Sequence, residues 1–455
     1  MPQMSSVFFR FYRMIPAYPT IFHRTPCAPK TTSVLKIKSG FIGWLSLCIK
    51  RLRIGIIDKT KSFKTKLLFY FDLHAIISVE VIAMKLLRVK ANHFKNCADG
   101  FTIDLVAKSR KTAEDKEYEL QEIAPELHVY NTMAFIGKNA SGKTSAMEFL
   151  DACYSILGDF RLENKHYSYD GVELEIIFYY EGYVYLYETV LGADTSLGNK
   201  AVFKNEHIYR KPYYKTNVRG VYDRDSFVEI TDAGDLPEDT SNIFFVLKKK
   251  QTRAIYFDSF GSGADTYQML FKALKNYDID VKVLANILCI FDENVDDLQK
   301  LDDHNYRLIF RGEEKTLSDT QLVYMLSSGT TKGLLLYTLM VASLKEGFDL
   351  LIDEVENHFH KTLVENMISL YKDKTVNARN ATLVFTTHYC EVLDQMGRQD
   401  NIWICKSDKH VSLSNMHEDY QIRPELLKSK QYYNNAFQTA VNYDELMKLK
   451  RKLKK

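Results

Sequence analysis

The sequence is poor in cysteine, and its few cysteines form no recognisable group. There are seven among 455 residues, and no two of them are spaced as Cys-x-x-Cys. A disulfide framework and a structural zinc site both need cysteines at short, set spacings. The pattern argues against a disulfide-stapled secreted fold and is typical of a protein in the reducing cytosol. We therefore expect a cytoplasmic protein.

Long apolar runs and long repeats are also missing. The run FIGWLSLCI is too short to span a bilayer, and LLFYFDLHAIISVEVIAM is interrupted by Asp72, His74 and Glu80. No secretory signal is evident, because no clean apolar core and cleavage site follow the basic start. No heptad repeat runs through the middle region, which argues against a long coiled-coil arm. We expect no membrane partner.

Acidic residues are scarce at the start of the chain. Residues 1–83 hold 13 Lys and Arg against three Asp and Glu, out of chain totals of 61 and 58. The remainder therefore has 48 basic and 55 acidic residues, a net charge of −7. We expect residues 1–83 to be a dispensable basic extension that does not belong to the natural fold. The acidic body has no overall field that would draw it onto nucleic acid.

From Met84 onward the hydrophobic pattern is regular and predicts an α/β protein. Residues 84–170 read as strands, a glycine turn and a helix, which is the first half of a core. Residues 171–260 alternate as an antiparallel β lobe, and 261–320 read as a helical insertion with two short strands. Residues 321–455 return to strands alternating with helices. That alternation predicts a mostly parallel core sheet flanked by helices.

The core strands are expected at four apolar segments. They are HVYNTMAFIG, FDLLID, TLVFTT and NIWICK, the fourth being the last strand of the core. The first is read as one strand that runs straight into the glycine turn, and SAMEFLDACYSIL after that turn has helical spacing. A strand, a glycine loop and a helix in this order are the setting that a phosphate-binding motif requires.

A complete phosphate-loop motif fills that setting. The sequence matches G-x-x-x-x-G-K-[ST], in which the backbone N–H groups of the loop surround an anion at a helix N-terminus. Lys143 would reach the β and γ phosphates and assist catalysis, and the Thr144 hydroxyl would bind Mg²⁺. We predict that ATP is bound by Gly137, Lys138, Asn139, Ala140, Ser141, Gly142, Lys143, Thr144 and Ser145.

An apolar strand ending in two carboxylates follows later in the chain, at Phe348 to Glu354. Asp353 would hold Mg²⁺ through water, and Glu354 would orient and deprotonate the attacking water, because phosphoryl transfer needs mainly positioning and charge compensation. Two acids after a strand are common at surface turns. Together with Lys143 they indicate an ATPase that converts ATP to ADP and phosphate.

Two further motifs complete a recognisable order. Leu-Ser-Ser-Gly-Thr opens a helix with Ser327 26 residues before Asp353, and His388 ends a strand 35 residues after it. This order resembles the ATP-binding-cassette (ABC) ATPases over most of residues 84–400, and it implies an ABC-type P-loop NTPase fold. The resemblance implies that Ser327 and Gly329 of one subunit cap the γ-phosphate bound by the other, and that His388 contacts the same phosphate. It thus implies a homo-oligomer of at least two copies, paired by ATP.

Departures from the usual cassette pattern narrow the resemblance. The signature is not Leu-Ser-Gly-Gly-Gln, the D-loop aspartate position falls on His360, and Gln251 is a candidate for the Q-loop glutamine. With these departures the sequence resembles the RecF, SMC and OLD-like branch more than it resembles the transporter cassettes. The segment from Asn401 onward is similar to the ending of standalone AAA-type proteins placed with abortive-infection and other anti-phage systems.

Three functions are consistent with the sequence. After His388 the sequence has 67 residues, too few for the TOPRIM nuclease domain of OLD-family nucleases, and no HNH constellation is evident. The pattern favours a sensor or regulator of an anti-phage defence system, with a nuclease or toxin as separate effector. The alternatives are a RecF/SMC-like DNA-repair ATPase and the ATPase subunit of an ABC transporter. The basic runs at Lys248–Lys250 and at the C-terminus leave nucleic acid open as a partner.

Overall fold

A computed structural model describes most of the chain after residue 83. The described residues are 84–163, 165–194, 200–230, 234, 236–258, 263–302, 304–357, 359–420, 422–423, 425–438 and 443–453. The expected basic extension, residues 1–83, lies outside the described residues.

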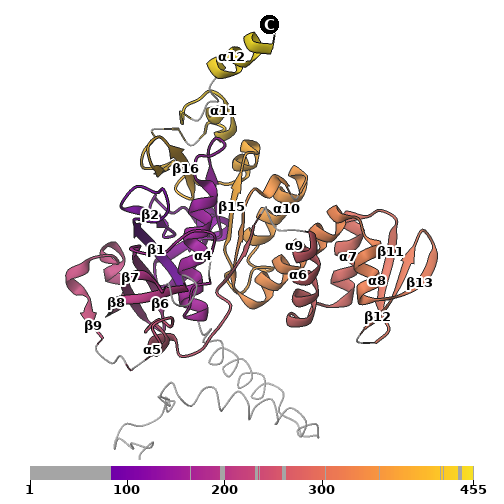
Figure 1. Cartoon of the computed structure of the whole chain (residues 1–455), viewed down its shortest axis with the longest axis horizontal. Helices are drawn as coiled ribbons and strands as arrows, with labels where there is room; N and C mark the ends of the chain where they lie inside the picture. The colour runs from indigo at the N-terminus through magenta and orange to yellow at the C-terminus, as the bar shows by residue number, and fades with distance from the viewer. Residues whose placement is uncertain are drawn as a thin grey trace, which may run out of the picture. The chain divides into compact units, whose positions relative to one another are not determined.

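A six-stranded sheet forms the centre of the fold, in the order β10-β14-β15-β5-β16-β17 (Figure 1). Its strands are β10 (Ala254–Phe257), β14 (Asp349–Ile352), β15 (Leu383–Thr387), β5 (Thr132–Ile136), β16 (Ile402–Ser407) and β17 (Val411–Asn415). The first five are parallel, and β17 runs antiparallel to β16. Strands β5 and β15 are buried at every position, as expected for parallel strands covered on both faces. The predicted α/β class with a mostly parallel core sheet is confirmed.

A second six-stranded sheet is antiparallel and has the order β2-β1-β6-β7-β8-β9. Its strands are β2 (Phe101–Asp104), β1 (Lys85–Asn92), β6 (Glu173–Tyr180), β7 (Tyr183–Asp194), β8 (Lys200–Pro212) and β9 (Val228–Glu229). The antiparallel strands expected after residue 171 therefore pair, through β6, with the first described strand of the chain. Strand β10, by contrast, belongs to the parallel sheet.

Helix α4 (Lys143–Asp159) packs between the two sheets (Figure 1). Its buried residue Phe149 lies in one apolar cluster with Val89 of β1 and Phe135 of β5. Successive side chains of a strand point to opposite faces, so Ala134 and Ile136 fall in the cluster on the other face of the parallel sheet. Helix α4 is thus held on both sides, which fixes the position of its N-terminus.

The other face of the parallel sheet is covered by helices. These are α9 (Ser328–Glu346) and α10 (Lys361–Lys372), and α6 (Gly263–Asn276) and α7 (Val281–Phe291) pack against α9. Beyond α7 lies a three-stranded antiparallel sheet of β11 (Val295–Lys300), β12 (Asn305–Phe310) and β13 (Glu313–Ser318), followed by α8 (Asp319–Met325). Two short strands were predicted near here. The additional strand, β11, pairs with β12 from Val295 to Lys300.

The remaining elements are short. They are η2 (Asp115–Glu119), β3 (Leu120–Ala124), β4 (Leu127–Tyr130), η4 (Lys215–Gly220), η5 (Arg224–Ser226), α5 (Phe244–Leu247), η6 (Val355–Asn357), η7 (Cys390–Gln395), α11 (Lys428–Tyr433) and α12 (Tyr443–Leu453). Strands β3 and β4 form a hairpin whose apolar residues Ile123 and Leu127 pack against Leu87 and Ile177 of the antiparallel sheet.

Two strand predictions were wrong in detail. The segment HVYNTMAFIG is two strands, because the chain leaves the β3–β4 hairpin at Asn131 and enters the parallel sheet at Thr132. The side chain of Asn131 donates a hydrogen bond to the Tyr118 carbonyl at 2.7 Å, which holds this change of direction. Segment NIWICK is not the last strand of the core, since β17 follows it after a polar turn and pairs with it.

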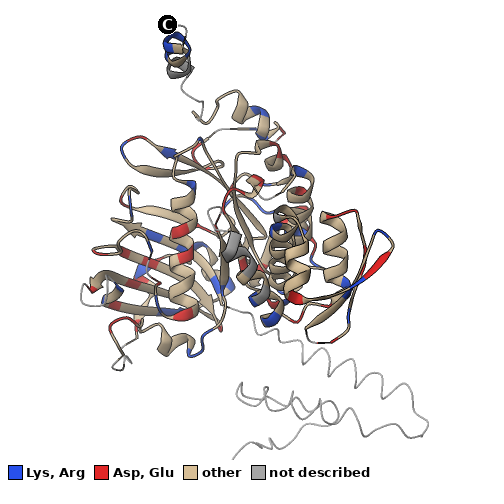
Figure 2. Cartoon of the chain, turned by 45° about the vertical axis from the view of Figure 1, so that its right-hand side comes forward, with Lys and Arg blue, Asp and Glu red and all other residues tan. Residues whose placement is uncertain are grey.

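Charged residues of both signs are spread over the helices and strands, and basic residues gather on α12 (Figure 2). Within the ranges given above, no helix combines the length and apolar character needed to cross a bilayer.

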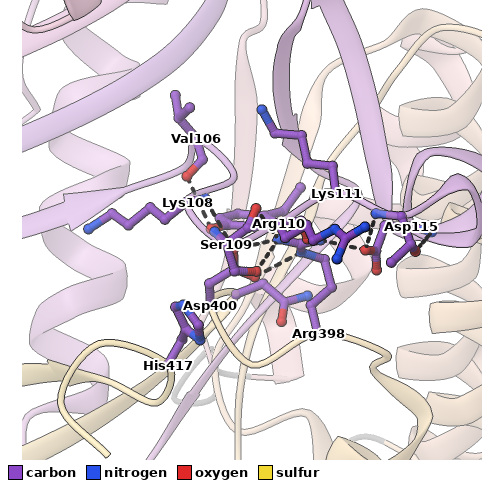
Figure 3. A network of polar contacts seen from close by, with 12 residues as sticks. Val106, Lys108, Ser109, Arg110, Lys111, Asp115, Arg398, Asp400 and His417 are labelled. Carbon is purple, nitrogen blue, oxygen red and sulfur yellow. Dashed lines mark hydrogen bonds and ion pairs between the residues drawn. The ribbon is translucent and has the colours of Figure 1, made fainter. Parts of the chain in front are cut away.

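A buried ion pair lies within the segment before β16, and its hydrogen bonds join this segment to residues 108–110, which precede η2 (Figure 3). Arg398 donates from Nε and Nη2 to the two oxygens of Asp400 at 2.8 and 2.6 Å, a bidentate geometry. Asp400 also accepts from the backbone N–H groups of Lys108 and Ser109, and Arg398 Nη1 lies 2.9 Å from Asp115. Burial alone would raise the pKa of Asp400, but the hydrogen bond and charge of Arg398 hold it below its usual value.

We expect Arg398→Met to reduce the free energy of unfolding by about 3–5 kcal/mol, because it leaves a buried carboxylate without its charge partner. Urea denaturation at pH 7 measures the loss. Since the folded-state pKa of Asp400 is depressed, the stabilisation that it brings should disappear as the pH falls through that pKa.

The matched control is Lys361→Met, which removes the exposed pair with Glu365 at 3.7 Å. Such a pair contributes less than about 0.5 kcal/mol. A loss in Arg398→Met no larger than in this control would contradict a structural role for the buried pair.

Candidate active site

Four segments of the chain meet at one edge of the parallel sheet. The glycine turn follows β5, the acidic pair follows β14, His388 follows β15, and Asp258 follows β10. The carboxyl ends of neighbouring parallel strands lie side by side, and the crevice outside them is where ligands of such sheets bind. Strand β15 lies between β14 and β5, so His388 emerges between the glycine turn and the acidic pair.

The glycine turn is packed closely against β16 and β17. Gly142 has a φ of +95° at the N-cap of α4, and a Cβ there would lie 2.2 Å from Val411 Cγ1. A Cβ on Gly137 would lie 2.6 Å from the carbonyl oxygen of Cys405. Only glycine fits at either position without displacing the neighbouring strand. Ser141 is buried within the turn, and its Oγ has no hydrogen-bond partner among the described residues.

Lys143 is the first residue of α4 and is only 5% exposed. Its Nζ donates to the carbonyls of Gly137 at 3.2 Å and Lys138 at 3.4 Å, and lies 2.9 Å from His388 Nε2. All three acceptors are neutral, and no ion pair joins Lys143 to any residue that the structure describes. Burial lowers the pKa of Lys143. A buried ammonium without a carboxylate partner favours an anionic ligand.

The contact with Lys143 also assigns the protons of His388. An ammonium can only donate, so Nε2 accepts and the neutral ring carries its proton on Nδ1. Burial, and then the charge of Lys143, lower the pKa of His388. The imidazole is therefore neutral at neutral pH in this arrangement.

Thr144 and Asp353 form a direct contact across the site. The Thr144 hydroxyl donates to Asp353 Oδ2 at 2.7 Å, and the Thr386 hydroxyl donates to Oδ1 at 2.6 Å. Asp353 is fully buried, and burial raises its pKa against these two hydrogen bonds. Hydroxyl and carboxylate oxygens are the ligands that Mg²⁺ prefers, and Mg²⁺ in nucleotide sites takes its other ligands from water and phosphate. The pair fits that ion, and no cluster of three or more His, Cys, Asp or Glu suited to a metal occurs in the described ranges.

Glu354 stands on strained backbone. Its φ is +48°, a left-handed conformation that costs a non-glycine residue roughly 1–2 kcal/mol. The strain is maintained by the backbone N–H of Glu354, which donates to Thr386 Oγ1 at 2.7 Å. The carboxylate accepts from Asn357 Nδ2 at 2.6 Å and is half-buried. Strain of this kind collects at functional sites, where the surroundings impose it.

Thr386 and Glu356 belong to this site and were missed from the sequence. Thr386 holds both Asp353 and Glu354, and Glu356 Oε1 accepts from the backbone N–H of His388 at 2.7 Å. The signals were present in the sequence as the second glutamate of Asp-Glu-Val-Glu and as the threonines before His388. Neither signal indicates a role in the site until the neighbouring strand of the sheet is known.

The expectation for Gln251 was wrong. Its N–H donates to the Gly158 carbonyl at 3.1 Å, at the C-terminal end of α4. The phosphate loop lies at the other end of this 17-residue helix, about 25 Å away. Asp258, directly after β10, occupies the carboxyl edge instead, and its charge helps to raise the pKa of Asp353.

Ser327 and Gly329 do not join the site of their own chain. Ser327 is the N-cap of α9, is exposed, and accepts from the Thr330 N–H at 3.1 Å. A Cβ added to Gly329 would find only Ser327 Oγ within 4 Å. Across the described ranges, neither residue hydrogen-bonds to the phosphate loop. The structure thus brings together Lys143, Thr144, Asp353, Glu354 and His388, and leaves Ser327 and Gly329 exposed.

A family model extends across these same segments. The family described as "AAA domain, putative AbiEii toxin, Type IV TA system" matches residues 133–394, more than half of the chain. The chain belongs to this family. The match begins in β5 and ends in η7, so the AAA domain contains every residue of the site. The protein is therefore an AAA domain protein, and its phosphate loop lies at the carboxyl edge of a mostly parallel sheet.

Other comparisons give distant structural similarity. The AAA domain protein is similar to an SMC head bound to the C-winged helix domain of ScpA, with 11% identity, 72% of this chain and 97% of that chain covered, and a TM-score of 0.36. It is also similar to the recombination mediator protein RecF with ATP in the RecFOR pathway, with 11% identity, 74% and 99% coverage, and a TM-score of 0.30. No curated protein matches it.

We expect Gly142→Ala to weaken the binding of a fluorescent ATP analogue at least about tenfold, a loss of about 1.4 kcal/mol, because the new Cβ would displace Val411 and the loop. The matched control is Gly171→Ala, where φ is +77° but no atom lies within 4 Å of the Cβ. It imposes similar backbone strain without a clash. Equal nucleotide affinity in the two variants would show that loop packing does not shape the site.

Proposed function

We propose that this AAA domain protein binds and hydrolyses ATP with Mg²⁺ at composite sites formed by two copies, and that this cycle regulates an anti-phage defence system with a separate effector. The observation that carries the proposal is the Lys143 ammonium, which is buried among neutral acceptors. It is surrounded by the groups that phosphoryl transfer needs.

Each residue of the site has a distinct role in the proposal. The loop from Gly137 to Ser145 and the Lys143 ammonium hold the phosphates. Thr144 and Asp353 hold Mg²⁺, which, when bound, neutralises phosphate charge. Glu354 orients and deprotonates the attacking water, and its strained backbone keeps the carboxylate at the end of β14.

The exposed Ser-Gly segment supports pairing of two copies. Ser327 and Gly329 lie at the N-terminus of a 19-residue helix, α9, whose dipole favours an anion. Ser327 and Gly329 are open to solvent and unbonded to the phosphate loop of their own chain. In the proposal they complete the site of a second copy by capping its γ-phosphate.

The family description supports the defence role. It names a putative AbiEii toxin and a Type IV TA system. We carry this setting to the present chain as a proposal, with ATP binding as the event that switches the response on or off.

We expect Glu354→Gln to lower ATP turnover by about 10²–10⁴-fold while ATP binding is retained, because the base is lost and the phosphate loop is not. The trapped ATP state should accumulate as a dimer or larger assembly. Phosphate release and sedimentation velocity with ATP and Mg²⁺ measure the two effects. Glu365→Gln, an acid on the surface of α10, is the control. Steady turnover by Glu354→Gln would reject Glu354 as the base.

The defence role predicts a phenotype for the same site. In cells that carry the gene with its natural neighbours, phage plating should be reduced by the wild-type protein and restored by Lys143→Ala. Plating efficiency across a phage panel measures this. Protection that persists in Lys143→Ala, after loss of turnover is verified in the purified variant, would contradict control of defence by ATP.

A further inference from the structure

Glu356 is a carboxylate at the active-site edge that none of the proposed roles uses. It lies in η6, two residues after Glu354, in the segment that connects β14 to α10. Its Oε1 accepts from the backbone N–H of His388 at 2.7 Å. This hydrogen bond joins the segment after β14 to the segment after β15, at the place where the histidine emerges.

Through this bond Glu356 is connected to the phosphate loop. The backbone of His388 is held by Glu356, and its imidazole accepts from the Lys143 ammonium at 2.9 Å. The three residues form a continuous series of acid, histidine and lysine from β14 to α4. The hydrogen bond between Glu356 and the main-chain N–H of His388 therefore helps to fix the position of the imidazole.

The second carboxylate oxygen of Glu356 has no partner among the described residues that would account for its burial. Oε2 is buried and has no hydrogen-bond partner in the part of the chain that the structure describes. A buried unpaired carboxylate oxygen costs free energy, so a purely structural role would favour a neutral side chain at this position. A role for Glu356 therefore rests on the hydrogen bond that its Oε1 accepts from the His388 N–H.

We propose that Glu356 is a positioning residue for His388. By holding the His388 N–H it keeps the imidazole within reach of Lys143 and of the phosphates that Lys143 would bind. The inference rests on the proposed function for the role of those phosphates. Glu356 itself contacts neither nucleotide nor water in this scheme and acts only through the histidine.

Three substitutions separate the hydrogen bond from the charge. Glu356→Ala removes both, Glu356→Gln keeps an oxygen that can accept from the His388 N–H, and Glu356→Asp keeps the charge on a shorter side chain. We expect the Ala and Asp variants to lose about 10–100-fold in kcat, the effect of a hydrogen bond to a charged group, and the Gln variant to stay within about threefold of wild type. The affinity for ATP should change less than about threefold in all three, because Lys143 and the loop are intact.

A double-mutant cycle tests whether Glu356 acts through the histidine. In a His388→Ala background, Glu356→Ala should cause no further loss of kcat. Multiplied losses, or wild-type kcat in Glu356→Ala, would overturn the proposal. So would activity kept by the Asp variant and lost by the Gln variant, which would assign the effect to charge. The matched control is Glu391→Ala, an exposed acid of the neighbouring η7 that accepts from Tyr433, and it should behave as wild type.

A second readout requires no turnover. Backbone hydrogen exchange at His388 should accelerate at least about tenfold in Glu356→Ala and not in Glu356→Gln, since only the former loses the acceptor. Unchanged exchange in Glu356→Ala would overturn the positioning role even if the protein proved unable to hydrolyse ATP. A wild-type protein that neither binds nor hydrolyses ATP would reject the proposed function, while the exchange result would still decide the role of Glu356.

Discussion

The hydrogen bond between Thr144 and Asp353 is the constraint on which the active-site edge depends. The two residues are 209 positions apart, and their side chains meet at 2.7 Å. This contact requires that β5 and β14 lie on either side of β15 and that α4 begins directly above the carboxyl edge. The clustering of Phe149 with both sheets holds the helix there. The site is therefore a product of layer packing, because no single loop carries it.

Several polar groups at this edge are buried and lack either a charged partner or a hydrogen-bonding partner among the described residues. Lys143 has neutral partners, Ser141 Oγ has none among the described residues, and Asp353 is fully buried. Burying each of these groups costs free energy. Phosphates and a divalent cation would satisfy the charges, so the same groups that lower stability prepare the site for a ligand.

The sequence was informative wherever chemistry and local pattern coincide. An apolar strand ends at each of the phosphate loop, the acidic pair and His388. The hydrophobic periodicity and the motifs together therefore predicted both the parallel sheet and the residues at its edge. Thr386, Glu356 and Asp258 could not be predicted, because their roles come from neighbours on other strands. Gln251 was misplaced for the same reason, since the register of β10 against β14 decides which residue reaches the edge. The break at Asn131 depends on a tertiary contact with Tyr118.

In the proposed composite site, one copy supplies Lys143 and the other supplies Ser327. The most direct measurement is ATP turnover by a mixture of two inactive variants, Lys143→Ala and Ser327→Arg. In a dimer that contains one copy of each variant, one of the two composite sites has both an intact Lys143 and an intact Ser327. A 1:1 mixture should therefore recover about a quarter of wild-type turnover, while each variant alone stays inactive. A mixture that remains inactive, although both variants fold and exchange subunits, would contradict the composite site.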